Sequence, residues 1–193
     1  MKLDIILSGV GGQGILSIST IIGAAAVKKG LFLKQAEVHG MSQRGGEVQS
    51  HLRLSDKEIH SDLLQLGKAH LIISMEPMES LRYLPFLNKD GWLITSSKPF
   101  INIPNYPPID DILKEIKKVP QHIIIDTDKI TEEIGSPLVT NMVILGAASE
   151  FMPIDINDLK EAVNSIFATK GEKVISMNLA ALDKGKEFSA QNK

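Results

Sequence analysis

The chain has 193 residues, of which 43% are hydrophobic, and a formal net charge of −2. This length predicts one domain, residues 1–193, with a sizeable core, and the small charge argues against a nucleic-acid or anionic-lipid partner. The absence of cysteine excludes disulfides, thiolate catalysis and cysteine-ligated zinc or iron–sulfur clusters within this chain. Any redox metal would have to be carried by another chain.

The first half of the sequence alternates short apolar runs with helical patterns, which is typical of a sheet covered by helices. Strands are expected at residues 3–8, 31–38, 47–55, 69–75, 91–97 and 122–127. Helices are expected at residues 13–29, 76–87 and 109–119. The stretch 98–108 contains four prolines and should be extended. Ser55–Lys57 is turn-like, and Glu58–Ser61 is expected to return as a hairpin strand, so the sheet should be mixed.

From Asp128 onwards the pattern is helical, with segments at residues 129–134, 138–151, 157–169 and 172–188. The fold class predicted is therefore α/β: a three-layer, Rossmann-like domain. Its sheet is expected to be mostly parallel but mixed, and its C-terminal segment, residues 128–193, mostly helical. No window approaches the roughly 18 uninterrupted apolar residues of a transmembrane helix, and the N-terminal MKLDII lacks a signal-peptide pattern. We expect a cytoplasmic protein.

The glycine-rich stretch LSGVGGQGIL follows the first strand and opens the first helix. Gly9, Gly11 and Gly14 satisfy G-x-G-x-x-G, and Glu37 follows about 20 residues later, where a ribose-binding acid would lie. One interpretation is an NAD(P)-binding Rossmann oxidoreductase. The other is that the glycines only permit a tight turn and close packing. A phosphate-loop NTPase does not fit, because Ile15 and Leu16 replace the required lysine and hydroxyl residue.

A second polar loop, HGMSQRGG at His39–Gly46, holds several groups suited to binding. Arg44 offers a planar fork for carboxylate or phosphate, and the alternative is a solvated surface loop. A nucleophile elbow does not fit, because Arg44 stands where G-x-S-x-G needs glycine. The five histidines show no ligand spacing, so no metal site is expected. Glu76 should lie at the carboxyl end of a strand, where ligands dock, or cap a helix N-terminus.

Read together, GVGGQGIL and EVHGMSQRGGEVQSHLR resemble the gamma-type domain of the 2-oxoacid:ferredoxin oxidoreductases, and the small (beta) subunit of the indolepyruvate type in particular. The resemblance continues through MEPMESLRYLPFL, NMVILGA and MNLAALDKGKEF, so it covers nearly the whole chain in order. The GGQG and RGG elements are common to the whole family. The E-x-H-G-M-x-Q-R-G-G and EP-x-E-x-x-R forms point to the indolepyruvate type.

The resemblance implies a subunit of a complex that oxidatively decarboxylates indolepyruvate to an aryl-acetyl-CoA and reduces ferredoxin. The large (alpha) subunit would carry thiamine diphosphate, magnesium and [4Fe-4S] clusters. Coenzyme A would be a co-substrate, and this chain would hold no cofactor and no catalytic residue. The alternatives are the same type of complex acting on pyruvate or another 2-oxoacid, and a pure assembly module.

Both glycine loops should lie at the carboxyl edge of the sheet and face the large subunit or CoA. The residues concerned are Gly11, Gly12, Gln13, Gly14, His39, Gly40, Ser42, Gln43, Arg44, Gly45 and Gly46, with Glu76 and Asn141 as edge contacts. Gln43 and Arg44 would face substrate, a CoA phosphate or a partner carboxylate. An isolated subunit should expose an apolar docking face and could form a homodimer through it.

Overall fold

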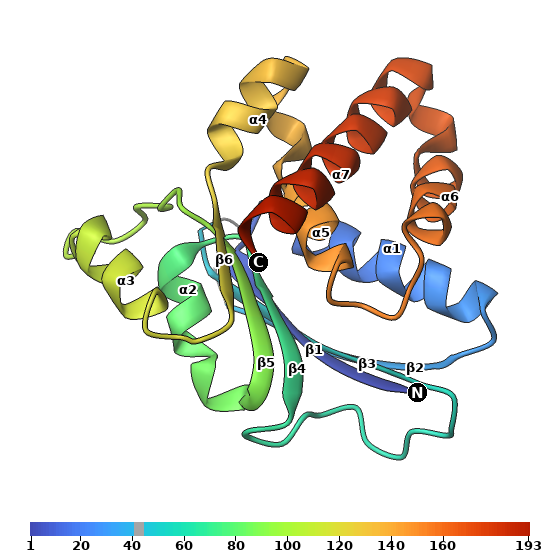
Figure 1. Cartoon of the computed structure of the whole chain (residues 1–193), viewed down its shortest axis with the longest axis horizontal. Helices are drawn as coiled ribbons and strands as arrows, with labels where there is room; N and C mark the ends of the chain where they lie inside the picture. The colour runs from blue at the N-terminus through green and yellow to red at the C-terminus, as the bar shows by residue number, and fades with distance from the viewer. Residues whose placement is uncertain (41–44) are drawn as a thin grey trace.

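The computed structural model describes residues 1–40 and 45–193, and it contains one six-stranded sheet in the order β2-β3-β1-β4-β5-β6 (Figure 1). The strands are β1 (Lys2–Val10), β2 (Phe32–His39), β3 (Glu47–Ser55), β4 (Ala69–Ser74), β5 (Leu87–Ser96) and β6 (His122–Ile125). The helices are α1 (Ile15–Lys28), α2 (Pro77–Arg82), α3 (Ile109–Ile116), α4 (Thr127–Ile134), α5 (Thr140–Ser149), α6 (Ile156–Phe167) and α7 (Glu172–Asn192). Short 3-10 turns are η1 (Leu84–Phe86), η2 (Pro137–Val139) and η3 (Ala168–Lys170).

The sheet is mixed, as predicted, because β3 runs against both of its neighbours. The other neighbouring pairs, β1–β4, β4–β5 and β5–β6, are parallel. The carboxyl ends of β1, β4, β5 and β6 therefore meet at one edge of the sheet. The chain enters β3 at the same edge, so Gly45 and Gly46, which precede β3, lie beside the loop after β1.

Helices cover both faces of the sheet, which confirms the three-layer α/β architecture (Figure 1). The larger core lies between the sheet and α1, α5, α6 and α7, and is built mainly from aliphatic side chains. The smaller core lies on the opposite face, under α2 and α3. Strand β1 serves both cores: Ile5 and Leu7 face the larger one, whereas Ile6 faces the smaller one. This alternation is the two-residue period of a strand buried on both sides.

Helix α5 is buried along nearly its whole length, and two glycines let it approach α7 closely. A Cβ atom on Gly146 would lie 2.0 Å from the Leu182 carbonyl oxygen. A Cβ atom on Gly185 would lie 2.0 Å from the Val143 carbonyl oxygen. These positions cannot hold a larger residue unless the two helices move apart. The close contact holds the C-terminal helical segment against the sheet domain.

The hairpin return expected at Glu58–Ser61 is wrong. Strand β3 ends at Ser55, and residues 56–68 cross to β4 without forming a strand. Side chains hold this segment in place: Arg53 Nη1 donates to the Ser61 carbonyl at 2.9 Å, and the Leu64 N–H donates to His51 Nδ1 at 2.9 Å. Because these bonds satisfy backbone groups, the segment is held without a ladder partner.

The helix expected at residues 76–87 is also shorter than predicted. It comprises α2 and the 3-10 turn η1, and Pro85 interrupts it because proline lacks the N–H that a helix needs. Strand β5 consequently begins at Leu87, where it pairs with Ala69 across an irregularity in the ladder. Among the helices of residues 1–40 and 45–193, none has the length and apolar character to cross a membrane.

Candidate functional site

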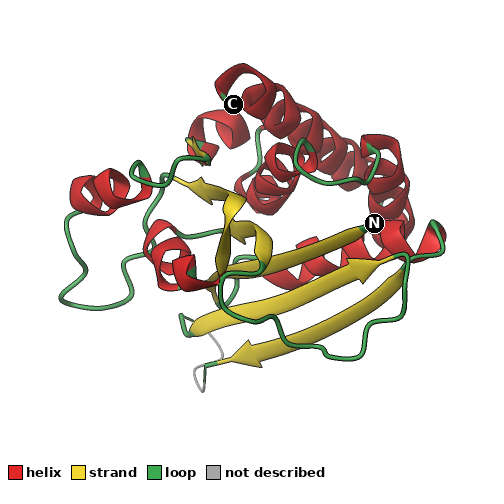
Figure 2. Cartoon of the chain, turned by 60° about the horizontal axis from the view of Figure 1, so that its bottom comes forward, coloured by secondary structure: helices red, strands yellow, loops and turns green. Residues whose placement is uncertain are grey.

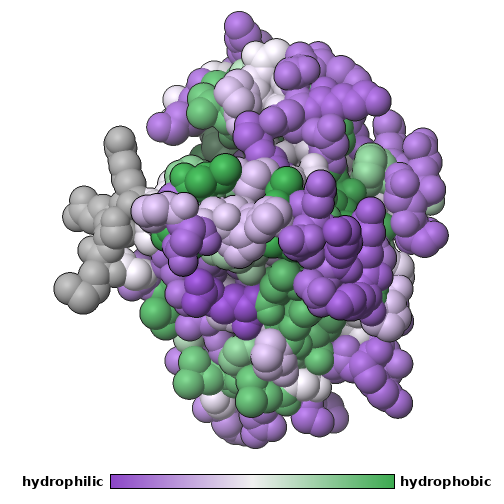
Figure 3. All heavy atoms as spheres, turned by 90° about the vertical axis from the view of Figure 1, so that its left-hand side faces the viewer, coloured by the Kyte–Doolittle hydropathy of each residue, from purple (hydrophilic) through white to green (hydrophobic). Residues whose placement is uncertain are grey.

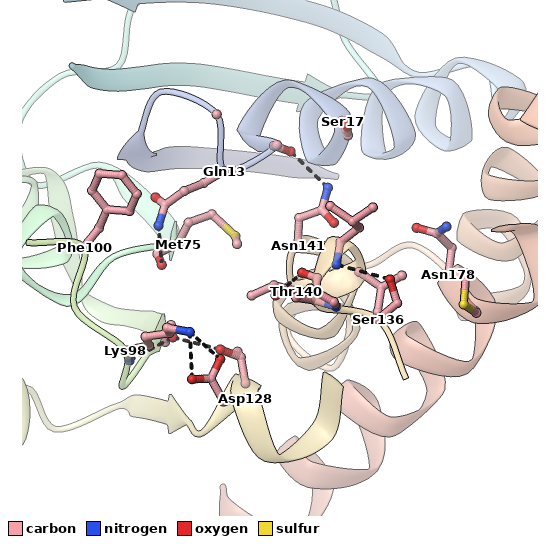
Figure 4. Close-up of a pocket in the computed structure, with 18 of the residues that line it drawn as sticks. Gln13, Ser17, Met75, Lys98, Phe100, Asp128, Ser136, Thr140, Asn141 and Asn178 are labelled. Atoms are coloured by element: carbon pink, nitrogen blue, oxygen red, sulfur yellow. Dashed lines mark hydrogen bonds and ion pairs between the residues drawn. The ribbon is translucent and has the colours of Figure 1, made fainter. Parts of the chain in front are cut away.

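The turn between β1 and α1 is held by the side chain of Gln13. Gln13 Oε1 accepts from the Val10 N–H at 2.7 Å, and its Nε2 donates to the Met75 carbonyl at 3.4 Å (Figure 4). Gly12 and Gly14 have φ values of +101° and +79°, which side chains rarely adopt. The turn is thus tied to the end of β4, and its backbone takes a path that only glycine follows without strain.

The two glycine loops lie against each other, as the sequence predicted for the residues that the structure describes. The Gly11 N–H donates to the Gly46 carbonyl at 2.8 Å, and the Gly45 N–H donates to the Gly11 carbonyl at 3.5 Å. Asn102 Nδ2 donates to the Gly45 carbonyl at 2.6 Å and ties the proline-rich segment to the same place. At the other end of the loop, the Gly40 N–H donates to the Glu47 carbonyl. The candidates Ser42, Gln43 and Arg44 lie outside the described residues.

A cavity of about 570 Å³ opens beside the first glycine loop. It lies between the β1–α1 turn, the segment after β5, the beginnings of α4 and α5, and one side of α7 (Figure 4). Its lining is mixed, with apolar side chains such as Met75, Phe100 and Met177 beside polar ones such as Gln13 and Asn178. This volume is in the range of ordinary small-molecule sites.

Three helices begin at the cavity wall, and their N-termini influence which charge the cavity prefers. Lining residues come from the first turns of α1, α4 and α5: Ser17, Thr127, Asp128, Thr140 and Asn141. Helix α7 lines the cavity along one side, through Val174, Met177 and Asn178. Each helix N-terminus carries a partial positive charge, although the Asp126 carboxylate caps α4 and Asn141 accepts from the Met142 N–H in α5. Lys98 and Lys170 add two cations to the wall, while Asp128 pairs with Lys98 at 2.8 Å. The cavity therefore favours an anionic group.

The rim of this cavity carries exposed apolar side chains. Leu138 is 87% exposed, and Ile101, next to the cavity residue Phe100, is 71% exposed. Figure 3 views the molecule from the side of α2 and α3, and apolar patches lie there between strongly polar groups. Exposed apolar surface of this kind, beside a cavity, is typical of a place where another molecule docks.

Asn141 braces the glycine turn against α5. Its Nδ2 donates to the Gly14 carbonyl at 3.3 Å, and its Oδ1 accepts from the Met142 N–H at 3.0 Å (Figure 4). A Cβ atom on Gly14 would lie 2.6 Å from Asn141 Nδ2. Asn141 lines the cavity as well, so the residue expected to be an edge contact both holds the turn and faces the open space.

Glu76 is buried and uses both carboxylate oxygens inside the chain. Its Oε2 accepts from the Glu79 N–H at 2.8 Å and caps α2, as the helix-cap alternative predicted. Its Oε1 accepts from the Phe100 N–H at 3.3 Å and from the Tyr106 hydroxyl. Burial, and then the bond to Glu76, raises the pKa of Tyr106 above its usual value. Glu76 thus positions the segment that forms one cavity wall.

Tyr83 is a buried residue that the sequence did not indicate, and it supports the second glycine loop. Tyr83 donates its hydroxyl proton to Glu47 Oε1 at 2.6 Å, and Glu47 directly follows Gly46. Arg82 binds Glu79 through Nε at 3.0 Å and Nη2 at 3.2 Å. Burial raises the pKa of the Glu79 carboxyl, although Arg82 opposes the shift. The motif glutamates and arginine of the EP-x-E-x-x-R form therefore belong to a scaffold that holds the segment after β5 and the start of β3.

The NAD(P) interpretation of Glu37 does not fit the sheet order. A dinucleotide fold places its acidic residue on the strand next to β1, but here the antiparallel strand β3 separates β2 from β1. Glu37 instead contacts His39 and Gln35 on its own strand. Within residues 1–40 and 45–193, no three His, Cys, Asp or Glu side chains gather as metal ligands do.

Comparison with known proteins gives a consistent picture. Residues 4–188 match the family model described as pyruvate ferredoxin/flavodoxin oxidoreductase. The chain is 39% identical to the indolepyruvate oxidoreductase subunit IorB of Archaeoglobus fulgidus over 96% of this chain and 94% of that one. It is 33% identical to the IorB subunit of Methanothermobacter thermautotrophicus over the full length of both.

A solved structure has the same fold and reveals how the unit occurs elsewhere. The 2-oxoglutarate:ferredoxin oxidoreductase of Magnetococcus marinus, with 2-oxoglutarate, coenzyme A and succinyl-CoA bound, matches with a TM-score of 0.79 and 25% identity. The match covers 100% of this chain but 32% of that one. The fold found here is thus one part of a longer polypeptide in that protein.

Proposed function

This chain belongs to the pyruvate ferredoxin/flavodoxin oxidoreductase family, and we propose that it is the small subunit of an indolepyruvate:ferredoxin oxidoreductase whose cavity binds coenzyme A. The chain is a subunit of a 2-oxoacid:ferredoxin oxidoreductase complex, on the basis of the family match and the full-length relatives. The indolepyruvate assignment rests on the names of those relatives. A 2-oxoglutarate enzyme is the alternative that the Magnetococcus structure favours.

The observation that carries the CoA proposal is the convergence of the N-termini of α1, α4 and α5 on one cavity. Coenzyme A carries a diphosphate and a 3′-phosphate, and helix N-termini with glycine turns are suited to bind phosphates. Gly12 leaves open space next to its Cα, so a phosphate could approach the backbone closely. Lys98 and Lys170 would neutralise the remaining charge, and the apolar walls would pack against the pantetheine or adenine portion.

The partner that completes the site would be the large subunit. In that complex the partner chain would supply thiamine diphosphate for decarboxylation and iron–sulfur clusters that accept the electrons. This chain would bind CoA and orient it, with Glu76 and Asn141 holding the cavity walls in place. The exposed side chains of Leu138 and Ile101 would be covered by the large subunit.

Calorimetric titration of the full chain with CoA, pantetheine and NADH tests the proposal. We expect saturable binding of CoA, and none of pantetheine, which has no phosphate, or of NADH. Lys98→Ala should weaken CoA binding by about 10-fold, because it also leaves Asp128 uncompensated at the cavity. Lys118→Ala is the matched control: Lys118 is equally exposed and ion-paired, with Glu115 on α3, but does not line the cavity.

Saturable NADH binding without CoA binding would overturn the proposal and favour a free-standing Rossmann oxidoreductase. Binding of neither ligand, with normal association to the large subunit, would favour an assembly module. The substrate is tested separately, by comparing turnover of indolepyruvate, pyruvate and 2-oxoglutarate in the reconstituted complex. The loop outside the described residues is tested by Arg44→Ala, which should weaken subunit association or CoA-dependent turnover.

A further inference from the structure

Strand β2 forms one end of the sheet and pairs with β3 alone. Figure 2 shows it as the outermost of three long strands. It is eight residues long, whereas β6 at the opposite end of the sheet has four. It contains neither proline nor a bulge, the usual devices that block further pairing at an edge.

The ladder with β3 shows which backbone groups of β2 point outward. The Gly40 N–H donates to the Glu47 carbonyl at 2.7 Å, in line with the register that places His39 opposite Val48. Hydrogen-bonded positions alternate along an antiparallel ladder. The even-numbered residues of β2 therefore bond to β3, and the N–H and C=O groups of Leu33, Gln35, Glu37 and His39 point away from the sheet.

We propose that two copies of this chain join through antiparallel pairing of β2 with β2, with Gln35 opposite Gln35 of the second copy. The pairing would be isologous, around a two-fold axis perpendicular to the sheet. In this register Leu33 lies opposite Glu37 of the second copy. The outward-pointing N–H and C=O groups of the two strands therefore face each other. It also places Phe32 opposite Val38, and these are the exposed large apolar side chains of the strand, at 49% and 53%.

Charge selects this register from the neighbouring ones. A shift in one direction sets Lys34 opposite Lys34, and a larger shift in the other sets Glu37 opposite Glu37; like charges directly opposite destabilise a pair. The intermediate register centred on Ala36 has no such repulsion, but it places Val38 opposite Lys34 and loses the contact with Phe32. Lysine on an edge strand normally discourages pairing, but Lys34 already has Asp62 as an ion-pair partner at 3.5 Å.

The joined edge is separate from the cavity and its apolar rim. The cavity lies at the carboxyl ends of β1, β4, β5 and β6, and no residue of β2 lines it. The chain could therefore pair with a second copy while another subunit covers Leu138 and Ile101. The inference does not depend on CoA binding, so either proposal can fail while the other holds.

Single-cysteine variants give the sharpest test, because the chain has no cysteine of its own. Directly opposite residues of a hydrogen-bonded pair have Cα atoms about 5.5 Å apart, within the span of a disulfide. Under mild oxidation, Gln35→Cys should yield a cross-linked dimer at least about 10-fold faster than Leu33→Cys, whose symmetry mate lies farther away. Combining Leu33→Cys with Glu37→Cys should restore cross-linking. Preferential cross-linking of Ala36→Cys would overturn the register.

The association itself is measured by sedimentation of the full chain over a concentration series. We expect a dimer, and Val38→Lys should shift the equilibrium towards monomer by about 10-fold or more. Val27→Lys is the matched control, because Val27 is 58% exposed on α1 and outside the edge strand. Thermal unfolding verifies that both variants fold. A monomeric wild-type chain, or equal effects of the two substitutions, would overturn the proposal.

Discussion

Gly146 and Gly185 lie where α5 meets α7, whereas Gly12 and Gly14 lie in the turn between β1 and α1. At the helix contact the backbone is ordinary and space is the limit, since a Cβ atom would lie 2.0 Å from a carbonyl oxygen. In the turn the limit is conformation, since Gly12 has a φ of +101° and a Cβ atom there would meet nothing within 4 Å. Glycine therefore permits close packing between α5 and α7, whereas in the β1–α1 turn it leaves the backbone accessible.

The contrast separates residues that maintain the fold from residues available to a ligand. Gly146 and Gly185 each have a neighbouring helix packed directly against them, so nothing else can reach them. Gly12 lies on the cavity wall with open space in front of it. Gly14 is intermediate, because it has a positive φ and also touches Asn141. A series of alanine substitutions should therefore separate stability from binding.

Gly146→Ala should have the largest effect on stability. The new methyl group meets backbone rather than a flexible side chain, so α5 and α7 must separate. We expect a loss of about 3 kcal/mol in the free energy of unfolding, measured by urea denaturation. Ala147→Gly, in the same buried helix, is a control for helix propensity and should cost about 1 kcal/mol plus its lost packing. Equal losses would show that the close approach is not what requires glycine.

Gly14→Ala should cost less, about 2 kcal/mol. About half comes from the left-handed backbone and the rest from displacing Asn141, whose Nδ2 bonds to the Gly14 carbonyl. The test is a double-mutant cycle with Asn141→Ala, measured by denaturation. If the two residues interact as described, Gly14→Ala should be less costly in the Asn141→Ala background. Strict additivity would contradict a direct contact.

The local features of the fold were predictable from the sequence, and the same glycines show why. A strand, a glycine turn and an amphipathic helix are specified by adjacent residues, so the β1–α1 unit was predictable. The role of Gly146 was not, because its partner Leu182 lies in another helix. The position of β3 between β2 and β1 was not predictable either, because the sequence pattern of a strand does not reveal which strands lie beside it.

The candidate site was predictable only in part. The glycine loops can be recognised in the sequence, but the cavity forms because the starts of α1, α4 and α5 and one side of α7, far apart in sequence, meet at one edge. The roles of Glu76 and Tyr106 depend on a contact across 30 positions. A carboxylate that follows a strand looks the same in sequence whether it faces a ligand or caps a helix. Only the positions of Phe100 and Tyr106 reveal that Glu76 holds a wall of the cavity.

Gly12→Ala should have the smallest effect on stability and yet a clear effect on binding. Space is available for the methyl group, so only the positive φ is penalised, by about 1 kcal/mol. Gly30→Ala is the matched control, because Gly30 has a φ of +73°, the same open surroundings and no place in the cavity wall. Both variants should lose similar stability by denaturation, but only Gly12→Ala should weaken CoA binding, by about 10-fold in calorimetric titration. If the two variants bound CoA equally well, the open backbone at Gly12 would have no part in recognising it, and the difference between packing glycines and ligand-facing glycines would not extend to this turn.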